Sequence, residues 1–173
     1  MLILSAELYN KDLMAIRTGD KIGNIDSPII NPDNLHIDGF YCTNIRGDRL
    51  HLLDIHIRDF SSRGIIIDDP SDLSEKEELI RLQPVINIGF ELIGKTVISG
   101  RKKLGKVIDF ATEKESLYIQ KLYVKPSVWS SINTPQLTID RSSIIEINNS
   151  QIIISGPDER VKLGKNSSVM ATD

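Results

Sequence analysis

Apolar residues occur in short runs that alternate with polar positions, and turn-forming residues separate the runs. Isoleucine dominates several runs, including residues 64–68 (GIIID), 143–147 (SIIEI) and 151–155 (QIIIS). β-branched side chains pack well on a pleated sheet and lose rotamer freedom in a helix. Many short strands separated by Gly, Pro, Asn and Asp predict an all-β protein made of sandwiches or small barrels.

The same pattern of residues occurs twice in the chain. Residues 23–42 (GNIDSPIINPDNLHIDGFYC) align without a gap with residues 105–124 (GKVIDFATEKESLYIQKLYV). Further on, residues 54–70 align with residues 141–157, and both segments end in proline. The chain therefore contains two copies of one unit, and such internal repeats determine the fold more strongly than local propensities do.

The apolar alternation changes phase at the same place in each copy. Leu35 and Ile37 share one parity, whereas Phe40 and Cys42 share the other; the corresponding residues of the second copy are Leu117, Ile119, Leu122 and Val124. A strand can bury both sets on one face only if an extra residue intervenes. We predict β-bulges at residues 38–39 and 120–121, and a core that contains Leu35, Ile37, Leu117 and Ile119. Bulged strands bend, as the walls of a small barrel must.

The repeat divides the chain into four parts. The first copy is predicted over residues 1–73 and the second over 85–157, and residues 158–173 show no periodicity and are expected to form a flexible tail. Between the copies, Ser74 and Glu77 have the spacing of a capping box. This predicts a short connecting helix over about residues 75–82, within 74–84, that Pro84 ends.

Two segments of the second copy resemble the PRC-barrel domain family. Residues 90–110 (FELIGKTVISGRKKLGKVIDF) are similar to the opening of that domain, and residues 138–155 are similar to its closing hairpin. The resemblance implies a tandem protein of two small, strongly bent β-barrels. In the photosynthetic reaction centre H subunit and in a ribosome maturation factor, this module binds other proteins or tunes its neighbours. The family has no shared catalytic motif, so the resemblance implies no catalytic residue.

Composition and charge narrow the class of protein. The chain is 40% apolar and 26% charged, which is ordinary for a folded domain, and its net charge of −3 argues against direct nucleic-acid binding. Cys42 is the only cysteine, which excludes an intrachain disulfide. The N-terminus lacks the basic region of a signal peptide, and no apolar run is long enough to span a membrane. We expect a cytoplasmic protein.

The sequence has no strong candidate for catalysis or metal binding. His36 alternates with two apolar residues and should point to solvent, and His51 and His56 are expected to be solvated strand residues. Asp54 and His56 share a strand face, yet no third metal ligand accompanies them. We therefore predict no catalytic residue, no metal and no cofactor. The strongest basic feature, Arg101 to Lys103, is expected to be a solubilising hairpin tip.

A partner would most plausibly contact the insertion that distinguishes the second copy. Residues 125–135 (KPSVWSSINTP) make its loop longer and include the only tryptophan. Val128, Trp129 and Ile132 have the spacing of one helical turn. They either cap the open end of the second barrel or anchor a partner, because tryptophan is enriched at binding hot spots.

These observations favour a non-catalytic adaptor that binds another protein. A ribosome- or RNA-linked role in assembly is the first alternative, and an enzyme or ligand carrier is the second. A homodimer through a free barrel face stays open.

Overall fold

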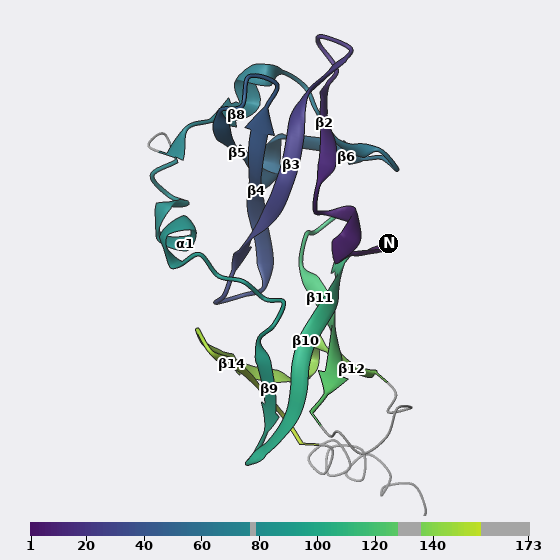
Figure 1. Cartoon of the computed structure of the whole chain (residues 1–173), viewed down its shortest axis with the longest axis vertical. Helices are drawn as coiled ribbons and strands as arrows, with labels where there is room; N and C mark the ends of the chain where they lie inside the picture. Colours follow the sequence, from purple (N-terminus) through teal and green to yellow (C-terminus); the bar gives the residue numbers. More distant parts are fainter. Residues whose placement is uncertain (77–78, 128–135, 157–173) are drawn as a thin grey trace, which may run out of the picture.

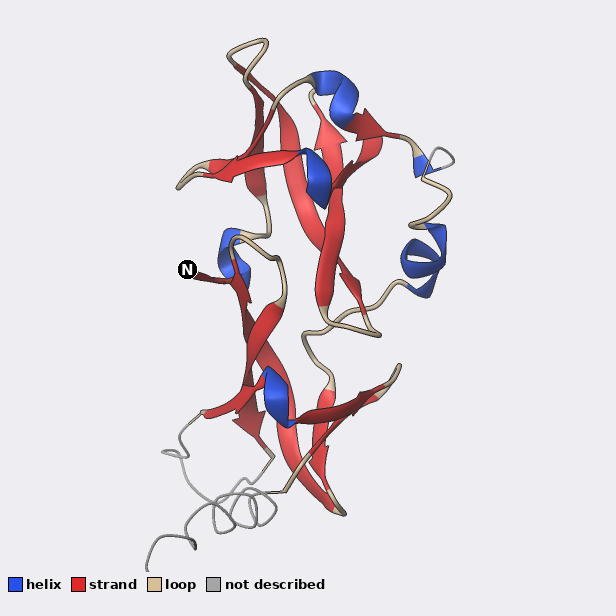
Figure 2. Ribbon diagram, turned by 180° about the vertical axis from the view of Figure 1, so that it is seen from behind, coloured by secondary structure: helices blue, strands red, loops and turns tan. Residues whose placement is uncertain are grey.

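The computed structural model describes residues 1–76, 79–127 and 136–156. Two β-sheets of seven strands each follow one another along the long axis of the molecule (Figure 1). Both sheets are mixed and strongly curled, so that each forms a half-barrel (Figure 2). The prediction of an all-β protein with two strongly bent units is confirmed.

The first sheet has the strand order β6-β7-β2-β3-β4-β5-β8. Its strands are β2 (Lys11–Ala15), β3 (Asp20–Asn31), β4 (His36–Asn44), β5 (Arg49–Leu53), β6 (Ile57–Phe60), β7 (Gly64–Ile67) and β8 (Leu73–Ser74). The 3-10 helices η2 (Asp54–His56) and η3 (Pro70–Asp72) connect its later strands.

The second sheet repeats this arrangement in the order β13-β14-β9-β10-β11-β12. Its strands are β9 (Thr96–Ser99), β10 (Lys102–Glu113), β11 (Ile119–Pro126), β12 (Leu137–Asp140), β13 (Ile144–Ile147) and β14 (Gln151–Ile154), with η5 (Arg141–Ser143) before β13. In each sheet one pair is parallel, β2 with β7 and β9 with β14. The seventh strand is β1 (Leu2–Leu4), which pairs with β10 and is followed by η1 (Ser5–Glu7). The N-terminus thus adds to the sheet of the second copy.

The predicted bulges are present in both copies. The extra residue is Asp38 in the β3–β4 ladder and Gln120 in the β10–β11 ladder. A second pair of bulges, at Asp26 and Ile108, lies nearer the other end of the same ladders. This second pair also shifts the alternation, since buried Val107 and Phe110 lie on either side of Ile108, but it was not predicted from the sequence. Equivalent bulges in both hairpins explain why both sheets curl in the same way.

The core is continuous across the two copies. Leu35, Ile37, Leu117 and Ile119 are all buried, as predicted, and belong to one hydrophobic cluster with residues of both sheets. Between the sheets, the Ile37 N–H donates to the Leu117 carbonyl (3.0 Å) and the Ile119 N–H donates to the Leu35 carbonyl (2.9 Å). Because these residues are equivalent, the two bonds are related by an approximate two-fold axis. The repeat therefore also defines the junction.

The connecting helix lies further along the chain than predicted. α1 spans Gln83–Ile88, and Pro84 stands in its first turn instead of ending it. Proline is well suited there, because the first helical N–H groups have no intrahelical acceptor. Ser74, the predicted cap, belongs to strand β8, and Glu77 lies outside the described residues. α1 packs through Ile86 on a small cluster that includes Ile29 of β3.

Candidate functional site

The predicted partner contacts, Val128, Trp129 and Ile132, lie outside the described residues. The chain that leads to them is described as far as Ser127, which borders an open hollow of the second copy. This hollow is about 540 Å³ and lies along strands β10 and β11 and the segment before β9. We call it the basic groove; it is lined by Ile93, Gly94, Lys103, Lys106, Val107, Ile108, Lys125, Pro126 and Ser127.

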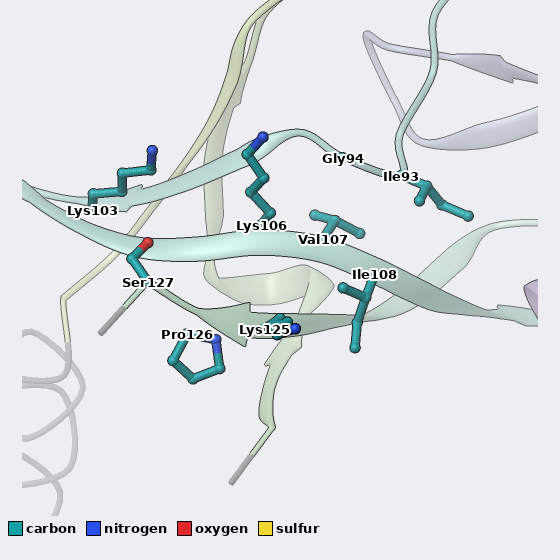
Figure 3. A pocket seen from close by; sticks show the side chains of 9 residues that line it. All are labelled: Ile93, Gly94, Lys103, Lys106, Val107, Ile108, Lys125, Pro126 and Ser127. Carbon is teal, nitrogen blue, oxygen red and sulfur yellow. The ribbon is translucent and has the colours of Figure 1, made fainter. Parts of the chain in front are cut away.

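Two adjacent strands place three lysines around the basic groove. Lys103 and Lys106 come from β10, Lys125 comes from the adjacent strand β11, and all three side chains are exposed. Figure 3 shows the amines of Lys103 and Lys106 pointing the same way, with Lys125 seen nearly end-on from the neighbouring strand. The close spacing of these cations creates a local positive surface on a chain of net charge −3.

Between the lysines the groove is aliphatic. Val107 is buried and forms part of the floor, whereas Ile93 and Ile108 are 40% and 45% exposed. Ile108 is the extra residue of a bulge, and this position turns its side chain outward instead of into the core. The groove thus combines exposed apolar surface with positive charge.

The groove lysines differ from several other cations of the protein in having no acidic partner. Within the described parts of the chain, none of the three makes an ion pair or a side-chain hydrogen bond. By contrast, Lys114 contacts Asp59 and Lys121 contacts Asp140, each at 2.7 Å. The positive charge of the groove is therefore left uncompensated.

The first copy has a different set of residues at the same positions. The ladders show that Lys21 is equivalent to Lys103, and Lys21 pairs with Asp12 at 2.6 Å. The residue equivalent to Asp12 is Thr96, which cannot form this ion pair. The remaining counterparts, Asn24, Asp26 and Thr43, replace Lys106, Ile108 and Lys125. Thr43 donates a hydrogen bond to Asp26 (2.8 Å), so the first copy has a neutral or acidic surface there.

A second polar cluster lies at the junction of the copies, where equivalent residues meet. The His36 ring packs edge-on against the Tyr118 ring, with their centroids 4.7 Å apart. The Arg141 guanidinium lies over the same Tyr118 ring, 4.7 Å from its centroid. Arg141 also donates to the Asn34 carbonyl across the junction (2.5 Å). The prediction that His36 points to solvent is wrong, because the second copy covers it. This cluster joins the two copies and so has a structural role.

Two carboxylates flank His36 within this cluster. Asp38 lies 2.7 Å from the His36 Nδ1 atom, and Asp54 lies 3.8 Å from Nε2. Burial is the main cause that raises the pKa of Asp54, whereas the Ile55 N–H and His36 act in the opposite direction. Burial removes water from the carboxylate and so disfavours its charged form, and the hydrogen bond and the histidine offset this only in part; the pKa of Asp54 therefore rises.

The two other histidines and the cysteine do not come together in one site. His51 is buried and its ring packs against Tyr41, so the prediction of a solvated His51 is wrong. His56 is part-exposed and lies 3.6 Å from Asp72. Among residues 1–76, 79–127 and 136–156, no three His, Cys, Asp or Glu side chains come together as metal ligands would. Burial raises the pKa of Cys42 to about 12, which keeps it as an unreactive thiol.

Sequence analysis found only one of the three groove lysines. Lys103 belongs to the basic tip noted above, but Lys106 and Lys125 are isolated in the sequence, and the fold brings them to it. The signal that could have found them is the repeat itself. Where one copy has a neutral residue and the other has Lys, the fold that both copies share does not require the lysine.

No protein-family model matches the chain, and no curated protein is similar to it in sequence. The two curled mixed sheets are consistent with a protein of two small β-barrel domains. No helix in the described residues is both long and apolar enough to cross a membrane.

Proposed function

We propose that this chain is a non-catalytic, cytoplasmic protein-interaction module built from two PRC-barrel-like repeats, and that the basic groove is its docking site. One observation carries the proposal: lysines with no acidic partner among the described residues line the same hollow as exposed aliphatic side chains on one copy and are replaced on the other. Exposed apolar surface rimmed by polar or charged residues marks interaction sites.

The architecture suits docking. The groove lies on strands whose registers are fixed by bulges and by a core shared between the copies. A site built on strands keeps its geometry without a partner, which lowers the entropy lost on binding. The first copy would then stabilise the fold of the second copy, which carries the groove.

The lining of the groove argues for binding and against catalysis. The nine described lining residues include no carboxylate, imidazole or thiol, so none of them activates Ser127 as a nucleophile. Lys and Ser side chains together with aliphatic ones provide contacts and hydrogen-bond donors, as in the rim and centre of a protein interface.

A site-directed crosslinking experiment tests this proposal. A photo-reactive residue at Ile108 should crosslink to another protein in native lysate, and the same residue at Ile55, which is 76% exposed on the first copy, should not give that product. The product should decline when Lys106→Asn and Lys125→Thr are introduced together. Crosslinks that are equal at both positions, or that join the protein only to RNA, would overturn the proposal.

A further inference from the structure

We infer that the basic groove binds an extended acidic peptide segment in which Asp or Glu residues flank a large apolar side chain. This inference rests on the proposed function and names the chemistry of the partner. It follows from three properties of the groove: its charge, its aliphatic surface and its difference from the equivalent surface of the first copy.

The positive charge of the three lysines favours an anionic ligand that spans two strands. Lys103, Lys106 and Lys125 project from β10 and β11 and lack acidic partners in the described chain. A compact anion would meet one or two of these amines. An extended segment with several carboxylates can meet all three, and such complementary charge contributes to orientation and association rate.

The aliphatic lining of the groove favours a ligand that also carries an apolar group. Ile93, Val107 and Ile108 line the hollow, and Pro126 adds a further aliphatic surface. A leucine or phenylalanine side chain of the peptide would remove this surface from water, which is favourable in proportion to the area buried. Carboxylates alone would leave it exposed.

The same residues disfavour nucleic acid as the ligand. Within the described part of the chain, the groove is lined by no aromatic side chain, on which an unpaired base would stack, and by no arginine, which binds phosphate in a bidentate manner. The net charge of −3 also repels a long polyanion at a distance. A short acidic peptide is less affected by that repulsion than a nucleic acid strand.

The first copy shows that the fold does not need these lysines. Asn24 and Thr43 stand at the positions of Lys106 and Lys125 on an equivalent pair of strands. The substitutions Lys106→Asn and Lys125→Thr therefore install residues that this backbone already accommodates. They remove charge from the groove without removing a described contact.

The test uses the full chain and three fluorescein-labelled probes: a Glu-rich peptide with a central Leu-Phe pair, the same peptide with Ser-Ser, and single-stranded oligouridylate. Fluorescence anisotropy at low and high salt measures binding. We expect the Leu-Phe peptide to bind in a salt-dependent way, about tenfold more weakly to the Lys106→Asn, Lys125→Thr variant, because two exposed charge contacts are lost. The Ser-Ser peptide should bind more weakly than the Leu-Phe peptide.

A matched variant controls for net charge. Arg46→Asn with Arg49→Thr removes two exposed cations from the first copy and should leave the affinity unchanged. Unchanged melting temperatures show that both variants fold. Equal binding of the two peptides would overturn the apolar part of the inference, and equal loss in both variants would show nonspecific attraction and overturn the groove assignment. Oligouridylate that binds more tightly than the peptide would overturn it in favour of nucleic acid.

The inference and the proposed function fail in distinguishable ways. If no acidic peptide binds but groove-dependent protein crosslinks form at Ile108, the partner is a protein of different chemistry and only the inference is overturned. If the groove-dependent crosslinks are missing as well, the proposed docking function is overturned with it.

Discussion

In the first copy Lys21 is neutralised by Asp12, and Thr43 is hydrogen-bonded to Asp26. In the second copy the equivalent strands carry Lys103 and Lys125, which have no such partners among the residues that the structure describes. The backbone beneath these side chains is the same, with matching ladders and bulges. One fold thus provides its own comparison. Features found in both copies are those the fold requires, whereas features found in one copy are available for function.

The backbone features that both copies share lie mainly at the ends of the long hairpins and at equivalent glycines. Leu35 and Leu117 both adopt positive φ, 52° and 54°, just before the residues that join the copies. A non-glycine residue with positive φ is unfavourable by itself, and burial of each leucine offsets that cost. The same unusual conformation in two copies identifies it as part of the junction.

The largest expected effect is at the shared core. Ile37→Ala and Ile119→Ala should each lower the free energy of unfolding by about 2–5 kcal/mol, because each removes a fully buried side chain. Since one core spans both copies, urea denaturation should show a single transition in either variant. Ile55→Ala, at an exposed position, is the control and should change stability by less than about 0.5 kcal/mol. Losses under about 1 kcal/mol at both isoleucines would contradict the shared core.

A smaller loss is expected at the equivalent glycines Gly23 and Gly105. A Cβ atom at either position would collide with a backbone carbonyl of the neighbouring strand, that of Thr43 or Lys125. Gly23→Ala and Gly105→Ala should each cost about 1–3 kcal/mol, as for overpacked sites. Gly156→Ala is the control for the loss of a glycine without a collision, since a Cβ atom there would meet only the Ser99 Oγ atom at 3.4 Å and the backbone is not in the positive-φ region. Thermal unfolding measures the three variants, and a harmless Gly105→Ala would show that the ladder is looser in the second copy.

Cys42 and Val124 are equivalent core positions that differ in ionisation. Burial, aided by the charge of Asp26, raises the pKa of the Cys42 thiol from 9.0 to about 12. The folded state therefore favours the neutral thiol: its contribution is complete below pH 9 and is lost as pH rises toward 12. At pH 10 the loss should be about 1.4 kcal/mol. Cys42→Val copies the second repeat and should remove this part of the pH dependence in urea denaturation at pH 7 and 10. Identical pH dependence in the two proteins would contradict the buried thiol.

The repeat is the reason that much of the fold was predictable. Period-2 alternation specifies which face of a strand is buried, and its phase shift located the bulges at Asp38 and Gln120. The connecting helix was misplaced because the polar spacing of Ser74 and Glu77 resembles a cap, whereas burial of Ile86 and the conformation of Pro84 favour a helix that starts later. Local propensity is weaker than such tertiary packing.

The site was less predictable than the fold. Lys106 and Lys125 are brought together by cross-strand pairing, and no spacing in the sequence reveals that. His36 was misjudged for a related reason: alternation specifies the side of its own strand but does not show that the second copy covers that side. Residues that act through contacts between elements need the topology before they can be recognised.

The smallest expected effect transfers one ion pair from the first copy to the second. Thr96→Asp installs the counterpart of Asp12, which forms an ion pair with Lys21, the equivalent of Lys103. In the β9–β10 ladder residue 96 stands directly opposite Lys106, so the new carboxylate lies near two groove lysines. An exposed ion pair of this kind should change the free energy of unfolding by less than about 1 kcal/mol. It should nevertheless weaken binding of the acidic Leu-Phe peptide several-fold, because one groove cation is neutralised. Thr96→Asn provides the uncharged control and should bind the peptide as the native chain does. If Thr96→Asp and Thr96→Asn bind the peptide alike, a negative charge beside Lys103 and Lys106 has no effect, and the charge that the peptide needs is confined to Lys125.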